Sequence, residues 1–273
     1  MPTEISDQFA SDAPAQRLPC YESREWLFYF RSNTQTLLEI PWETGPEISN
    51  EERVAITTSL QGFQLGESSE GRNLVRCAKA YAEATGDADY FEAIVLFIKE
   101  EQRHARDLGR FMDLNGIPRI AETWPDTVFR FMRRGAGLEL SVAVLVTAEI
   151  IAQVYYPALR AATQSVVLKS ICDQIIQDET PHVRFQCERL GLLRSKRSKL
   201  LLAMTYACQR FLFLGTCVVV WQAHRKVLRR SVNGFRGFWQ SAWARYFEAE
   251  AISRAVSLIQ SRGSQIAVAS DAP

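Results

Sequence analysis

The fold of this chain is decided by a Glu-x-x-His step in the stretch Lys99-Glu100-Glu101-Gln102-Arg103-His104. A second step of the same form follows in Gln177-Asp178-Glu179-Thr180-Pro181-His182. The chain holds only three histidines, so two of them stand in these steps. A Glu and a His three residues apart lie on one face of a helix and lean the same way along its axis. Each step therefore predicts two side chains able to hold one metal ion.

Apolar residues surround both steps at the spacing of a buried helix face. Around the first step, which includes Glu101, they alternate by four and three at Phe91, Ile94, Ile98, Ala105, Leu108 and Met112. Before Glu179 they are Leu168, Cys172 and Ile175. A carboxylate in an apolar interior costs free energy unless it is paired or coordinates a metal. Two inward Glu-x-x-His faces therefore predict a shared cation.

Each of these helices is expected to pack against a helix that supplies one more carboxylate. Dinuclear carboxylate bundles take a lone Glu from two helices and Glu-x-x-His from the other two. Glu149 stands in an apolar run 30 residues before Glu179, and Glu70 lies 31 residues before Glu101. These similar separations predict two similar helical hairpins.

The choice between Glu70 and Glu67 depends on where the first hairpin turns. A turn at Gly86-Asp87 places Glu70 nearly level with Glu101, as a turn near Gln164 does for the second hairpin. Glu67 shares the stripe but would be displaced by about one helical turn, roughly 5 Å. We therefore prefer Glu70 as the first ligand and keep Glu67 as the alternative.

The composition is that of a globular chain with balanced charge. It has 273 residues, 47% of them hydrophobic, and 32 basic against 31 acidic residues. This balance leaves no field that would attract nucleic acid. Six cysteines occur without a Cys-x-x-Cys pair, which favours a reduced, cytoplasmic setting.

Residues 200–221 are the one stretch that resembles a membrane segment. Gln209 and Arg210 interrupt it and leave an apolar run of 11 residues, which is too short to cross a bilayer. The first residues also lack the basic start and apolar block of a secretory signal. We expect a buried helix over residues 200–221 and no membrane span.

The chain is expected to form a single helical domain over residues 20–262, with a disordered leader at 1–19 and a disordered tail at 263–273. Helices are predicted over 21–38, 50–86, 87–115, 138–163, 165–190, 199–230 and 235–260. A crossover at 117–136 should contain a short helix at 126–134. Residues 62–71 are weak helix material and mark either a bend at the metal site or a boundary between two helices.

The six candidate ligands now carry a resemblance to a known family. Glu70, Glu101, His104, Glu149, Glu179 and His182 resemble the ligand pattern of ferritin-like di-iron carboxylate proteins. The chain is similar to bacterial ferritin-like domain proteins over roughly residues 48–192. Residues 100–104 also resemble the Asp/Glu-Glu-x-Arg-His form of bacterial multicomponent monooxygenases and of the ribonucleotide reductase small subunit. The resemblance implies an all-α, ferritin-like four-helix bundle with additional N- and C-terminal helices.

The resemblance further implies two iron ions, with manganese or a mixed pair as alternatives. In the family, the residue before each motif Glu hydrogen-bonds the histidine of the opposite motif. Asp178 would then hydrogen-bond His104, and Glu100 would hydrogen-bond His182. Pro181 departs from the pattern, because it stands where the first motif has an arginine, and we expect it to kink its helix.

The function that we expect is that of a di-iron oxidase or oxygenase. It would activate dioxygen for hydroxylation, desaturation or N-oxygenation of a small organic substrate, with electrons from an external donor because the sequence shows no flavin or iron–sulfur motif. The additional helices would form a substrate chamber or a homodimer face. Two alternatives remain: a ferroxidase or iron-handling ferritin-like protein, and a non-catalytic helical interaction protein with a vestigial site.

Overall fold

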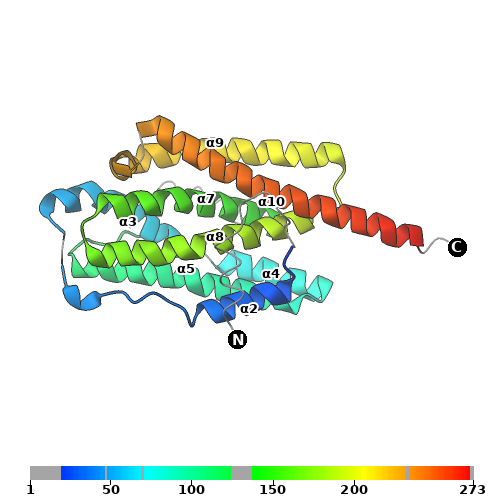
Figure 1. Cartoon of the computed structure of the whole chain (residues 1–273), viewed down its shortest axis with the longest axis horizontal. Coiled ribbons are helices and arrows are strands. Elements are labelled where there is room, and N and C mark those ends of the chain that lie inside the picture. The colour runs from blue at the N-terminus through cyan, green and yellow to red at the C-terminus, as the bar shows by residue number, and fades with distance from the viewer. Residues whose placement is uncertain (1–19, 47, 69–70, 124–136, 232–233, 271–273) are drawn as a thin grey trace.

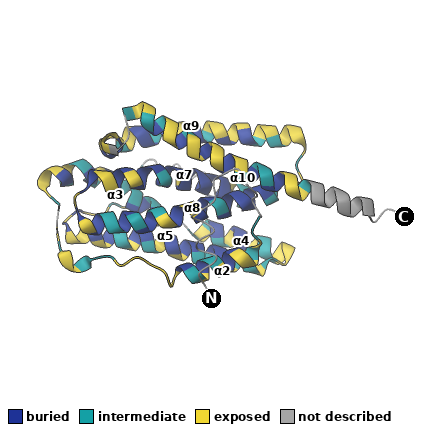
Figure 2. Ribbon diagram, in the orientation of Figure 1, coloured by how far each residue is buried: buried dark blue, intermediate teal, exposed yellow. Residues whose placement is uncertain are grey.

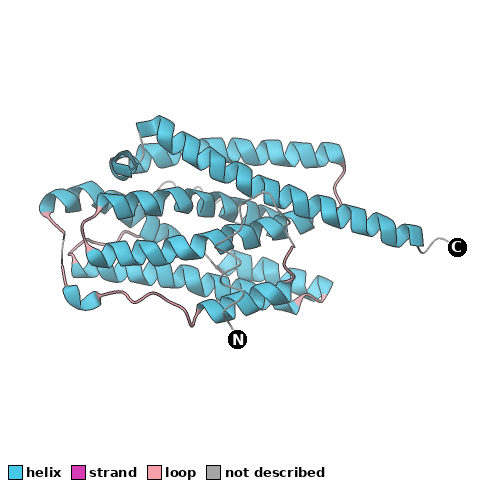
Figure 3. Ribbon diagram, viewed as in Figure 1, coloured by secondary structure: helices cyan, strands magenta, loops and turns pink. Residues whose placement is uncertain are grey.

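The computed structural model describes residues 20–46, 48–68, 71–123, 137–231 and 234–270. These residues form helices joined by loops, with no strand among them, so the all-α class is confirmed (Figure 3). The helices are α2 (Ser23–Asn33), η1 (Trp42–Thr44), α3 (Asn50–Ser68), α4 (Arg72–Thr85), α5 (Ala88–Leu114), α7 (Leu138–Ala162), α8 (Val166–Arg194), α9 (Lys199–Ser231) and α10 (Gly234–Ser270).

The ends of these helices follow local signals in the sequence. Helix α4 stops where Gly86 adopts the left-handed conformation, with a φ of 78°, which glycine reaches without a steric penalty. Asp87 then caps α5, because its side chain accepts a hydrogen bond of 3.1 Å from the backbone N–H of Tyr90. Ser165 caps α8 in the same way, through Leu168.

The weak segment at residues 62–71 is a boundary between two helices. Helix α3 ends at Ser68 and α4 begins at Arg72, next to Gly71 with a φ of 134°. A Cβ at Gly71 would also lie 3.2 Å from the Ile98 side chain. Both the positive φ and this close approach therefore favour glycine at position 71. The prediction that Glu70 lies at the same height as Glu101 requires one continuous helix from residue 70 to Gly86. Because a boundary lies between Ser68 and Arg72, that prediction no longer follows from helical geometry. Glu70 itself lies outside the described residues.

The long helices pack side by side around one apolar core (Figure 1). Helix α3 packs on α5 and α7, and α8 packs on α5 and α7. Helix α4 packs against α5 and α7, and α2 lies along α5 at the outer side. On the opposite side, α9 packs on α7 and α3 while α10 packs on α8 and α7. The carboxylates and histidines of the two motifs are thereby enclosed.

The C-terminal end differs from the sequence prediction. Helix α10 continues to Ser270, so the disordered tail predicted from residue 263 is wrong up to that residue. The physical reason is local: after Gly263 there is no proline before Pro273, and the residues between them can continue a helix. The predicted leader at 1–19 and the short helix at 126–134 lie outside the described residues.

Two helices are long and apolar enough to cross a membrane, judged by length and composition alone: residues Leu138–Ala162 and Lys199–Arg230. In the first, 72% of the apolar window is buried, which identifies it as a core helix. In the second only 33% of the apolar window is buried, so the helix expected to be buried at residues 200–221 is only partly buried (Figure 2). Among the described residues, helix α9 packs on α7, α3 and α10, and many of its remaining side chains are exposed.

Candidate metal centre

Six acidic and imidazole side chains from four helices meet inside the bundle. Glu67 comes from α3, Glu101 and His104 from α5, Glu149 from α7, and Glu179 and His182 from α8. All six are buried, with exposed fractions between 0 and 7%. Helix geometry explains the two pairs, because residues three apart share a face.

The six residues form two groups that have one member in common. Glu101, Glu149, Glu179 and His182 each offer one ligand atom, and these atoms lie within 4.8 Å of one another. Glu67, His104 and Glu179 form the second group by the same criterion. Glu179 therefore stands between two adjacent positions, each of which could hold a metal ion.

Both histidines turn the same ring nitrogen toward the acids. His182 Nδ1 lies 3.0 Å from Glu101 Oε1 and 3.9 Å from Glu149 Oε2. His104 Nδ1 lies 3.7 Å from Glu67 Oε2 and 3.8 Å from Glu101 Oε1. Nδ1 is therefore the nitrogen available to a ligand at the centre, and Glu101 lies close to both rings.

The atoms that face the centre lack hydrogen-bond partners. Among the described residues, these are Nδ1 of both histidines, Oε1 of Glu101, Oε1 of Glu149 and both carboxylate oxygens of Glu179. A buried polar atom without a partner costs about 1–3 kcal/mol. Hard carboxylate oxygens and imidazole nitrogens are suitable ligands for iron or manganese. The residues present therefore fit a metal centre, and a bound cation would satisfy these atoms together.

The opposite ring nitrogens are held by a second pair of carboxylates. His104 Nε2 donates to Asp178 Oδ2 at 2.9 Å, and His182 Nε2 donates to Glu100 Oε2 at 2.8 Å. These are the two pairings that the family resemblance implies. Each bond selects the tautomer that leaves Nδ1 free to bind a metal.

Asn33 joins these two carboxylates, and sequence reasoning missed it. The buried Asn33 amide on α2 donates to Glu100 at 2.8 Å and to Asp178 at 2.9 Å. Asp178 also accepts from Gln174 and pairs with Arg103. Asn33 lies 67 residues before Glu100, so no local pattern could have indicated it.

Burial and mutual repulsion perturb the titration of the centre. Burial raises the pKa of Glu101 and of Glu179 well above the usual value, and the neighbouring Glu149 raises both further. Burial opposes the charged form of His104, but its hydrogen bond to Asp178 and the nearby Glu67 carboxylate outweigh this and raise its pKa to about 10. Without a cation, burial and repulsion therefore favour the protonated forms of Glu101 and Glu179, and His104 keeps its proton at neutral pH.

Among the described residues, Glu67, the alternative to Glu70, is the carboxylate that the first hairpin contributes before Glu101. It is 7% exposed, its Oε2 faces His104, and its other oxygen accepts a hydrogen bond from the Tyr156 hydroxyl. Glu70 lies outside the described residues, so its role stays a prediction. The boundary at Gly71 means that helical spacing beyond Ser68 no longer predicts which side chains reach the centre.

Pro181 does not end α8, which is continuous over Val166–Arg194. His182 is fully buried and lies in the first group. In this turn the Gln153 side chain donates to the backbone carbonyl of Glu179 at 3.3 Å, which adds a contact from α7. The third histidine, His224, lies outside both groups and bonds Ser59 Oγ at 2.9 Å, as expected of a histidine with a structural partner.

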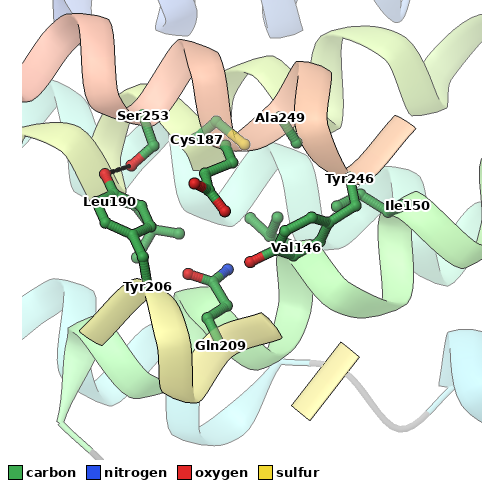
Figure 4. A pocket seen from close by; sticks show the side chains of 10 residues that line it. Val146, Ile150, Cys187, Leu190, Tyr206, Gln209, Tyr246, Ala249 and Ser253 are labelled. Carbon is green, nitrogen blue, oxygen red and sulfur yellow. Dashed lines mark hydrogen bonds between the residues drawn. The ribbon is translucent and has the colours of Figure 1, made fainter. Parts of the chain in front are cut away.

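A small cavity lies elsewhere, between α7, α8, α9 and α10. It is lined in part by Val146, Cys187, Tyr206 and Tyr246, and Tyr206 bonds Ser253 across one end (Figure 4). Its volume of about 10 Å³ is close to the least that holds one water molecule. This cavity is therefore not a chamber for an organic substrate.

In comparisons with protein-family models, with curated proteins and with solved structures, nothing matches this chain. The residues of the centre are therefore the features of this chain that bear on its function.

Proposed function

We propose that the protein is a ferritin-like di-iron oxidoreductase that uses dioxygen to oxidise a small organic substrate. The observation that supports this most strongly is the pair of buried ligand groups that share Glu179. Four helices contribute, with a lone Glu from two and Glu-x-x-His from the other two, which is the arrangement of ferritin-like dinuclear proteins. Manganese would suit the same ligand atoms.

The two groups would divide the ions between them. Glu101, Glu149 and His182 would hold one ion and Glu67 and His104 the other, with Glu179 shared by both. When bound, a pair of ferrous ions would supply electrons to dioxygen, and dioxygen would be the oxidant of the substrate. An external donor would restore those electrons.

Neighbouring side chains orient the six ligand residues, and burial shields those residues from water. Asp178 and Glu100 accept hydrogen bonds from the Nε2–H groups of His104 and His182. These bonds hold both Nδ1 lone pairs toward the centre. The Tyr156 hydroxyl donates to Glu67 and fixes the direction of that carboxylate. Burial of all six side chains excludes water, which would otherwise compete with a substrate.

The proposal is tested by loading the protein with ferrous iron without air and then admitting dioxygen. We expect about two irons per chain, rapid dioxygen uptake and a near-ultraviolet band of a ferric pair. Oxidation of an added organic compound, dependent on a reductant, would support the oxygenase function. Assembly into a cage that accumulates ferric mineral would instead indicate iron storage, and iron below about 0.2 per chain would contradict the proposal.

Iron binding should release protons and should become tighter as the pH rises. The raised pKa values of Glu101 and Glu179 favour their protonated forms, and the pKa of about 10 means that His104 carries a proton at neutral pH, so the metal displaces protons when it binds. We therefore expect the apparent affinity for iron to increase as the pH is raised toward about 10. Titration in weakly buffered solution measures the protons, and pH-independent binding without their release would contradict this prediction.

A further inference from the structure

Helix α9 carries an exposed apolar stripe that the metal centre does not use. The exposed fractions are Leu200 73%, Met204 56%, Phe211 74%, Leu214 42% and Val218 45%. Their spacing by four, seven, three and four places them on one face of the helix. The opposite face, which includes the fully buried Phe213 and Cys217, packs on the body of the protein.

Helix α10 extends this stripe sideways. Tyr206 bonds Ser253, Arg210 bonds Glu250, and the Phe213 ring stacks on Tyr246, so α9 and α10 run antiparallel. This register brings the exposed Leu258 and Ile259 level with residues 200–201. The half-exposed Phe247 lies 5.7 Å from the Arg210 guanidinium, at the edge of α9. Large exposed apolar patches mark interaction surfaces.

The charge of α9 distinguishes between possible partners. Over its whole described length it has six basic residues and no acidic residue: Lys199, Arg210, Arg225, Lys226, Arg229 and Arg230. The chain as a whole carries only +1, so this charge is local. Arg225 and Arg229 are exposed and continue the line of the apolar stripe beyond Val218. The stripe is therefore apolar along most of its length and basic at its C-terminal end.

These observations favour a lipid surface over a second copy of the chain. A parallel pairing of two α9 helices would bring their basic C-terminal ends together, and like charges at close range repel, whereas anionic headgroups would neutralise them. A helix whose exposed face is apolar and ends in basic residues fits the boundary between acyl chains and anionic headgroups. Because its other face packs on the protein, α9 would lie in the plane of the surface.

We propose that the protein docks on anionic lipid through α9, with residues 200–218 entering the acyl-chain boundary and Arg225 and Lys226 meeting headgroup phosphates. The inference stands apart from the proposed metal function, because it uses none of the ligand residues. It requires no helix to cross the membrane.

Sedimentation of the full chain with vesicles tests this proposal. We expect binding to mixed phosphatidylserine and phosphatidylcholine vesicles, weaker binding in high salt, and little binding to phosphatidylcholine alone. The double variant Phe211→Ser/Leu214→Ser should weaken binding about tenfold or more, since two apolar side chains no longer leave water. The matched control Val54→Ser removes a side chain that is 70% exposed on α3 and should bind as the wild type does.

The charge contribution has its own variants. Arg225→Gln/Lys226→Gln should weaken binding to the anionic vesicles about tenfold, whereas Arg24→Gln/Lys79→Gln, at exposed positions on α2 and α4, should not. Absence of vesicle binding would overturn the proposal, and so would a dimer that Phe211→Ser/Leu214→Ser dissociates in a chain that binds no lipid. Equal binding to both kinds of vesicle would also overturn it. Metal content, measured on the same samples, reports separately on the centre.

Discussion

Replacing Glu179 by alanine is expected to empty both metal positions at once, from about two irons per chain to below about 0.2. Glu179 belongs to both ligand groups, and both of its oxygens are buried without a hydrogen-bond partner. Its removal therefore takes a ligand from each ion. Metal analysis after anaerobic loading and desalting measures the loss, together with the near-ultraviolet absorption of the ferric pair.

Two controls make this result specific to the shared ligand. Glu149→Ala removes a member of one group only, so about one iron should remain. Glu188→Gln changes a buried carboxyl on the same helix that contacts Trp26 and Arg184, and it should retain both ions. Helical circular dichroism should persist in all three. Full iron content in the Glu179→Ala protein would show that the ligand assignment is incorrect.

Asp178→Ala should cause the largest loss of stability, lowering the free energy of unfolding of the metal-free protein by about 3–5 kcal/mol. Asp178 is completely buried and accepts hydrogen bonds from Asn33, Gln174 and His104, and it pairs with Arg103. Its removal leaves these donors facing a void. Urea unfolding followed by circular dichroism measures the change.

The pH dependence of this loss has a defined sign. Burial opposes the charge of Asp178, but its bond to His104 and the nearby positive charges depress its pKa below the usual range. A depressed pKa stabilises the fold above the unfolded-state value of about 3.9, and the effect disappears as the pH falls through the folded-state pKa. The difference between wild type and Asp178→Ala should therefore be full at neutral pH and shrink in acid.

A matched control is available on the same helix. Asp173 pairs with Arg160 at the surface, where ion pairs contribute little, so Asp173→Ala should have a much smaller effect at every pH. Equal losses in the two variants, or a loss at Asp178 that does not depend on pH, would contradict the role assigned to the buried carboxylate.

Several parts of the structure could be predicted because they depend on neighbours in the sequence. The stop at Gly86 and the cap at Asp87 are local backbone and hydrogen-bond effects. The faces that carry Glu101 with His104 and Glu179 with His182 follow from helical geometry alone. The ends of α5, α7 and α8 lie within a few residues of the predicted ends for the same reason.

The sequence by itself determined that this chain is helical and that two Glu-x-x-His faces point inward, because helical periodicity is a property of each segment. Only the tertiary structure decided that Glu67 reaches the centre after the boundary at Gly71, and that Asn33 joins Glu100 to Asp178. It also decided that α9 keeps one apolar face exposed. These outcomes depend on which helices become neighbours, and packing between distant segments selects those neighbours.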